Sequence, residues 1–266
     1  MTSLRRLSTT FAALFASAGL AGGAAAAQVQ VKVSVENLVP ADGIAFAPLR
    51  LAFHNGTFDS FNIGDTPTAA IISVAEGGSG SAWFPALQAA DPTATPGSVL
   101  PPSGPLLPGA TASATFSVDT SVNPYFSFAA MVVPSNDFFI GNDNPTAFHL
   151  FDASGNLAIT SIVQRARNVW DAGSEVYDPA AAAFVGNNDL RANQNSVVAF
   201  NFAELAAFNG LTTGAGYTFN SQLAADSEIY RITFETLPVP EPETYALMAL
   251  GLGMIGWGVR RAARRH

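Results

Sequence analysis

The sequence predicts an all-β protein: an antiparallel β-sandwich of about eight strands, flanked by a signal peptide and a C-terminal transmembrane helix. Two observations lead to this fold class. Short segments alternate apolar and polar residues with a period of two, as half-buried strands do, and Gly, Pro, Asn and Asp clusters bound them. No strong helical repeat occurs between these segments. A β-barrel is the alternative arrangement.

The clearest strand is 29–37, where valine alternates with Gln, Lys and Ser. Further strands are predicted, in order, at 48–54, 69–75, 111–118, 125–133, 157–163, 196–202 and 229–237. Short helices are predicted at 81–90 and 203–208. The stretch 91–110 holds six prolines, so we expect no regular element there. We interpret it as a connection within one domain rather than a domain boundary.

Residues 1–27 have the three parts of a secretory signal peptide. Arg5 and Arg6 precede an apolar run at 11–20, and small residues follow, with Ala25 and Ala27 in an A-x-A arrangement. We predict cleavage after Ala27. A membrane anchor is the weaker interpretation, because the apolar run is short and a strand pattern begins directly after it.

Residues 28–237 form the predicted domain, with 18 acidic against 6 basic side chains and a formal charge of about −12. The whole chain has 266 residues, 48% of them hydrophobic, which argues against disorder. It has no cysteine, which excludes disulfides and thiolate metal sites. Sparse basic residues argue against nucleic-acid binding, and three histidines make zinc catalysis unfavourable.

The C-terminal segment 238–266 has three parts in a fixed order. Pro240, Glu241 and Pro242 precede sixteen uncharged residues at 244–259, and an arginine cluster follows. The apolar part predicts a transmembrane helix with its arginines in the cytoplasm. Together these parts resemble the PEP-CTERM sorting signal of Gram-negative bacteria. The resemblance implies that an exosortase recognises Pro240, Glu241 and Pro242 and removes the tail. The helix is then a transient inner-membrane anchor of a protein exported to the cell surface or beyond.

Two acidic loops are the candidates for chemistry. Asp137 lies in PSNDFFIG, directly after the strand at 125–133, and Asp171 and Glu175 lie in WDAGSE, where Gly173 frees the backbone to turn. Both carboxylates of the second loop could point at one centre, and gathered oxygen ligands suit Ca²⁺. The alternative is that these acids are turn formers or solvated charges.

The segments FSFAAMVVPSNDFFIG and WDAGSE resemble the signature of the spondin domain, which occurs in animal F-spondin and mindin and in bacterial secreted proteins. The resemblance covers roughly 29–236. It implies a β-sandwich similar to a C2 domain, with a divalent metal, usually Ca²⁺, held by Asp137, Asp171 and Glu175. Glu175 stands where animal members have Asp, so its side chain reaches further and its role as a ligand is less secure.

The leading hypothesis is an exported, Ca²⁺-binding module of the cell surface or extracellular matrix that is not an enzyme. An extracellular polysaccharide or other matrix component is its candidate partner. A glycan hydrolase that uses Asp137 and Glu175 as a carboxylate pair is one alternative, and a purely structural matrix component is another. Known nucleophile, zinc-protease and phosphate-loop motifs are absent. His54 and His149 lie in strand-like segments and are interpreted as packed or surface residues.

Overall fold

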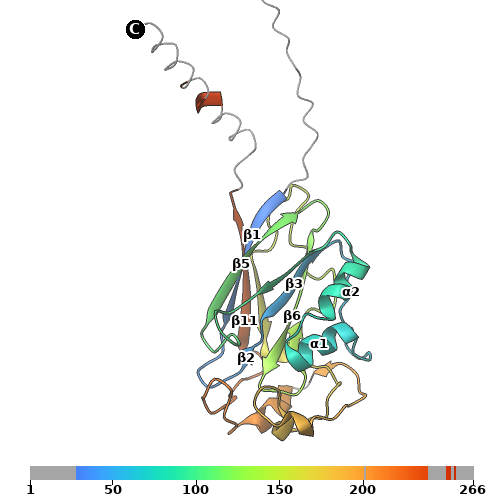
Figure 1. Ribbon diagram of the computed structural model, residues 1–266, viewed down its shortest axis with the longest axis vertical. Helices are drawn as coiled ribbons and strands as arrows, with labels where there is room; N and C mark the ends of the chain where they lie inside the picture. The colour runs from blue at the N-terminus through green and yellow to red at the C-terminus, as the bar shows by residue number, and fades with distance from the viewer. Residues whose placement is uncertain (1–27, 201, 239–249, 253–254, 256–266) are drawn as a thin grey trace, which may run out of the picture.

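The computed structural model of the protein describes residues 28–200, 202–238, 250–252 and 255 (Figure 1). The strands are β1 (Gln28–Asn37), β2 (Ala45–Phe46), β3 (Leu49–His54), β4 (Thr95–Val99), β5 (Thr111–Asp119), β6 (Tyr125–Val133), β7 (Phe138–Gly141), β8 (Ser161–Arg165), β9 (Trp170–Asp171), β10 (Ala199–Phe200) and β11 (Glu228–Leu237). The α-helices are α1 (Ala69–Gly77) and α2 (Trp83–Ala90). Four 3₁₀ helices are described: η1 (Ala166–Asn168), η2 (Pro179–Ala181), η3 (Asn188–Leu190) and η4 (Phe202–Phe208).

The strands form two antiparallel sheets, which confirms the prediction of a mostly β, antiparallel fold. One sheet has four strands in the order β5-β1-β11-β8. The other has seven, in the order β10-β9-β7-β6-β3-β4, with β2 paired to β6. In β1 the predicted alternation is confirmed, since Val31, Val33 and Val35 are buried and the residues between them are only half-buried. A sandwich of about eight strands stays a prediction, and the described chain has further short strands that show no period of two.

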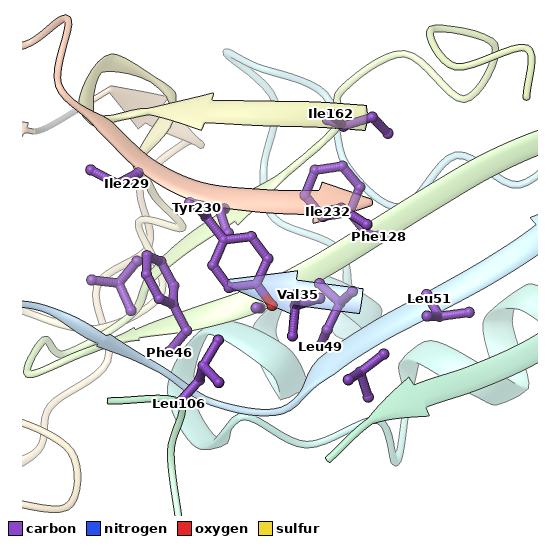
Figure 2. Close-up of a cluster of buried hydrophobic side chains, with 14 of the residues drawn as sticks. Val35, Phe46, Leu49, Leu51, Leu106, Phe128, Ile162, Ile229, Tyr230 and Ile232 are labelled. Atoms are coloured by element: carbon purple, nitrogen blue, oxygen red, sulfur yellow. The ribbon is translucent and has the colours of Figure 1, made fainter. Parts of the chain in front are cut away.

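Side chains from both sheets meet in one hydrophobic cluster (Figure 2). Tyr230 and Ile232 of β11 contribute from the four-stranded sheet, and Phe46 of β2 and Phe128 of β6 contribute from the other. The rings of Phe46 and Tyr230 meet edge to face, with centroids 4.7 Å apart. Removing this apolar surface from water is the main source of stability for the fold.

Strand β6 is buried on both of its faces. Phe126 and Phe128 point into the cluster shared by the sheets, whereas Ala129 joins a second cluster with Ile71 of α1 and Trp83 of α2. Both helices therefore lie against the seven-stranded sheet (Figure 1). A strand covered on both sides has no polar face, which is why FSFAAMVV is a continuous apolar run.

The strand predicted at 69–75 is wrong, because this segment is helix α1. The Thr68 hydroxyl accepts a hydrogen bond from the Ile71 N–H at 3.2 Å and so caps the start of the helix. Gly78, at φ 59°, ends the helix and donates its N–H to the Val74 carbonyl at 2.8 Å. A short apolar run is compatible with either a strand or a helix, and here the capping residues Thr68 and Gly78 favour the helix.

The strands differ from the prediction at three further places. The proline-rich stretch 91–110 contains β4, which pairs only with β3 and lies at the edge of its sheet. Pro96 is tolerated there because an edge strand does not need every N–H for the sheet. The segment predicted at 157–163 becomes a strand only from Ser161, and the one at 196–202 shrinks to the exposed pair Ala199–Phe200.

Within the described part of the chain, the helices are too short or too polar to cross a membrane. The transmembrane helix predicted at 244–259 lies largely outside the described residues. Residues 1–27, with the predicted cleavage site at Ala27, and the Pro240-Glu241-Pro242 motif also lie outside them.

Candidate functional site

Asp137 ends the turn that joins β6 to β7. The Ser135 hydroxyl donates to the Val132 carbonyl at 2.6 Å and accepts the Phe138 N–H at 3.0 Å, which closes this turn. The Asp137 side chain is buried, with only 1% of the residue exposed. Phe138 then pairs with Asp171 across β7 and β9. The two acidic loops that the sequence singles out are therefore brought together by the register of one strand pair.

The WDAGSE loop folds over the Asp137 carboxylate. Gly173 lies in the left-handed region at φ 68°, and its N–H donates to Asp171 Oδ1 at 2.6 Å. A Cβ at this position would lie 2.6 Å from a backbone carbonyl oxygen, so only glycine fits. The Ser174 N–H, the Ser174 hydroxyl and the Glu175 N–H all donate to Asp137 Oδ2, at 2.7, 3.0 and 2.9 Å.

The charge of the Asp137 carboxylate is poorly stabilised in spite of these hydrogen bonds. Burial first, and then the negative charge of Asp171, raise the pKa of Asp137 to about 6. The hydrogen bonds from Ser174 and Glu175 act in the opposite direction but do not cancel the rise. Two carboxylates in one buried site repel each other unless a proton or another cation is shared between them. The Asp137 carboxyl group is therefore protonated more readily than an ordinary aspartate.

The Glu175 carboxylate contacts Arg191. Arg191 Nη2 forms an ion pair with Glu175 Oε1, lies 3.7 Å from Glu76 Oε2 and donates to the Glu76 carbonyl at 3.2 Å. Burial raises the pKa of Glu175, and Arg191 lowers it. Within the described part of the chain, Glu175 Oε2 and Arg191 Nε are buried without a hydrogen-bond partner. This ion pair is thus incompletely satisfied on both sides.

The structure brings Asp137 and Asp171 together and pairs the neighbouring Glu175 carboxylate with Arg191. In the described ranges, no three His, Cys, Asp or Glu side chains form a group that could hold a metal ion. Arg191 is the residue beside this site that the sequence analysis missed. Its signal is its isolation, because it is the one basic residue between Arg167 and Arg231 in an otherwise acidic stretch.

His54 is a packed residue rather than a base. Its Nδ1 accepts the Gly56 N–H at 3.0 Å, so the ring proton is on Nε2, which donates to the Ser127 hydroxyl at 2.9 Å. A base for Ser127 would have to accept the hydroxyl proton instead. Burial lowers the pKa of His54 to about 4. His149 is exposed and packs its ring against Tyr125.

The fold and this site define a mostly β protein with a buried acidic site. Residues 238–265 match the PEP-CTERM protein-sorting motif. This motif indicates an exported protein of a Gram-negative bacterium that is held in the membrane while an exosortase processes it. A search of curated proteins finds no match for the chain. No spondin-domain match is found, so that resemblance stays a prediction.

Proposed function

We propose that the exported domain binds Ca²⁺ at Asp137 and Asp171 and serves as a binding module of the cell surface or extracellular matrix, of the spondin-domain type. An extracellular polysaccharide or another matrix component is the proposed partner. The observation that carries the proposal is the buried pair of carboxylates, where the charge of Asp171 helps to raise the pKa of Asp137. Arg191 sits nearby but is paired with Glu175 and Glu76.

The residues at this site fit a calcium ion. Ca²⁺ takes carboxylate and carbonyl oxygens together with water, and it does not need three carboxylates. Asp137 Oδ2 already accepts three hydrogen bonds, so its Oδ1 is the oxygen that would reach the ion. Glu175 Oε2 is a buried oxygen that becomes a further ligand if Glu175 leaves Arg191. A bound ion would supply the positive charge that the Asp137–Asp171 pair favours.

The two alternative functions are less well supported. A hydrolase needs two carboxylates that a substrate can reach, with separated pKa values. Asp137 and Glu175 are only 1% and 5% exposed, and Glu175 is paired with Arg191. A purely structural matrix component would be exported by the same route but would show no response to calcium.

Thermal melting of the purified full chain, in millimolar Ca²⁺ and in EDTA, tests the proposal. We expect calcium to raise the melting temperature by about 5 °C or more, which is the size that linkage predicts for a site near saturation. Asp171→Asn should abolish this rise. The matched control is Asp189→Asn, which changes an exposed acid outside the site and should keep the rise. Identical melting of the wild type in both buffers would refute calcium binding.

A further inference from the structure

A cavity of about 310 Å³ lies beside the acidic site. Four consecutive polar residues form part of its wall: Asn193, Gln194, Asn195 and Ser196. Glu76 and Ser174 also line the cavity. Ser174 is the residue whose N–H and hydroxyl hold Asp137, so the cavity and the acidic site share a wall. The volume is at the lower end of the range of about 300–1,000 Å³ that is typical of ligand sites, which suits one small ligand unit.

The backbone of this wall is already paired with the WDAGSE loop. The Gln194 N–H donates to the Ser174 carbonyl at 2.7 Å, and the Ser196 N–H donates to the Gly173 carbonyl at 3.0 Å. Two of the four backbone N–H groups of the wall are therefore bound to the loop, and all four residues line the cavity. The amide groups of Asn193, Gln194 and Asn195 make no hydrogen bond to any other described residue.

The chemistry of the wall selects the class of ligand. Each amide side chain both donates and accepts hydrogen bonds, which matches hydroxyl groups that do the same. The residues that line the cavity include no Lys or Arg, and the neighbouring Arg191 is paired with Glu76 and Glu175, so an anionic ligand would lack a cation.

We propose that this cavity binds one sugar unit of a neutral glycan through Asn193, Gln194 and Asn195. The proposal rests on the proposed function as a matrix-binding module and names the class of its partner. The amide groups exchange hydrogen bonds with the sugar hydroxyls, and the Glu76 carboxylate is placed to accept one more. Pro67 and Ile72 supply apolar surface at the same cavity for the carbon face of the ring.

Affinity gel electrophoresis of the full chain, in gels cast with dextran, galactomannan or alginate, tests the proposal. At least one of the two neutral polymers should retard the protein, and the anionic alginate should not. Asn193→Ala combined with Asn195→Ala should weaken the association by about tenfold, the size expected for two lost neutral hydrogen bonds. The matched control is Asn220→Ala, which removes an exposed amide outside the cavity and should leave the retardation unchanged.

Three outcomes would overturn the proposal: retardation by alginate alone, no retardation by either neutral polymer, or equal retardation of the double variant and the wild type. Asn195→Asp keeps the shape of the side chain and removes its donor, so it should also lose retention without a loss of folding. The double variant should keep the calcium-induced rise in melting temperature. A chain that binds dextran or galactomannan but melts identically in calcium and EDTA refutes the calcium site and leaves the cavity proposal standing.

Discussion

Arg191→Gln should destabilise the calcium-free protein and enlarge its response to calcium. Breaking a buried ion pair by removing one partner costs about 3–5 kcal/mol, because the other charge stays buried. The side chain of Glu175 is 6% exposed but that of Arg191 is 26% exposed, so contact with water reduces the loss. We therefore expect about 2 kcal/mol, or about 4–8 °C in melting temperature for a domain of this size. The second partner, Glu76, is 28% exposed and 3.7 Å away, and adds little.

Calcium should recover part of this loss. Without Arg191, the Glu175 carboxylate is free to turn toward the ion, so no ion pair has to be broken when calcium binds. The affinity for calcium should then rise by about tenfold for each 1.4 kcal/mol of competition removed. Circular dichroism melting in EDTA and in calcium measures the stability, and isothermal titration calorimetry measures the affinity.

The matched control is Arg167→Gln, which breaks an ion pair with Asp226 at the surface, where the side chains are 55% and 75% exposed. Its stability should stay within about 0.5 kcal/mol of the wild type in both buffers. Two results would refute the reasoning about Arg191. If Arg191→Gln melts like the wild type in EDTA, the ion pair with Glu175 is not stabilising. If its calcium-induced rise is no larger than that of the wild type, Arg191 does not compete with the ion.

Three further predictions follow from single residues. The pKa of buried His54 lies at about 4, below the usual value of about 6.5, so His54 takes up a proton on unfolding at mildly acidic pH. The free energy of unfolding should therefore have its full value above about pH 6.5 and fall by up to about 3 kcal/mol as the pH drops to about 4. Urea unfolding of His54→Gln should lack this slope, measured in an Asp137→Asn background because the raised pKa of Asp137 acts in the opposite direction over that range. Since a proton and calcium compete for Asp137, calorimetry should find calcium binding about fourfold weaker at about pH 5.5 than at about pH 7.5. Gly173→Ala should lower the free energy of unfolding in urea by about 3 kcal/mol. The control Gly210→Ala should lower it by only about 1 kcal/mol, because Gly210 also has a positive φ but has open space around it. Equal losses for the two variants would mean that the clash at Gly173 is relieved.

Strands β1, β5 and β11 of the four-stranded sheet were predictable because one of their faces is more exposed and largely polar. In β1, the buried Val31, Val33 and Val35 alternate with half-buried polar residues, so the period of two is visible in the sequence. Helix α1 was missed for the opposite reason. It is a short apolar segment packed on a sheet, and the residues that make it a helix, Thr68 and Gly78, lie outside the apolar run. Strand β4 was missed because its identity depends on its position at a sheet edge, which is a tertiary property.

The site was predictable only as far as local turns determine it. Gly173 must take a positive φ, so the turn of the WDAGSE loop could be expected from the sequence. The approach of Asp171 to Asp137 depends on the pairing of β7 with β9, and in the sequence only the family resemblance implied it. The direction of the Glu175 side chain could not be expected. It depends on Arg191, which comes sixteen residues later and reaches Glu175 through the isolated bridge between Glu175 and Asn193.

The topology places the sorting motif at one end of the domain. Gln30 at the start of β1 pairs with Leu237 at the end of β11, so the described domain begins and ends on the same side, and the loops near residues 180–220 lie at the opposite end (Figure 1). β1 and β11 are the two inner strands of their sheet. The sheet therefore closes only when the chain is available as far as Leu237, directly before the matched motif at 238–265. An attachment through the sorting motif therefore acts at the end of the domain that lies opposite the loops near residues 180–220.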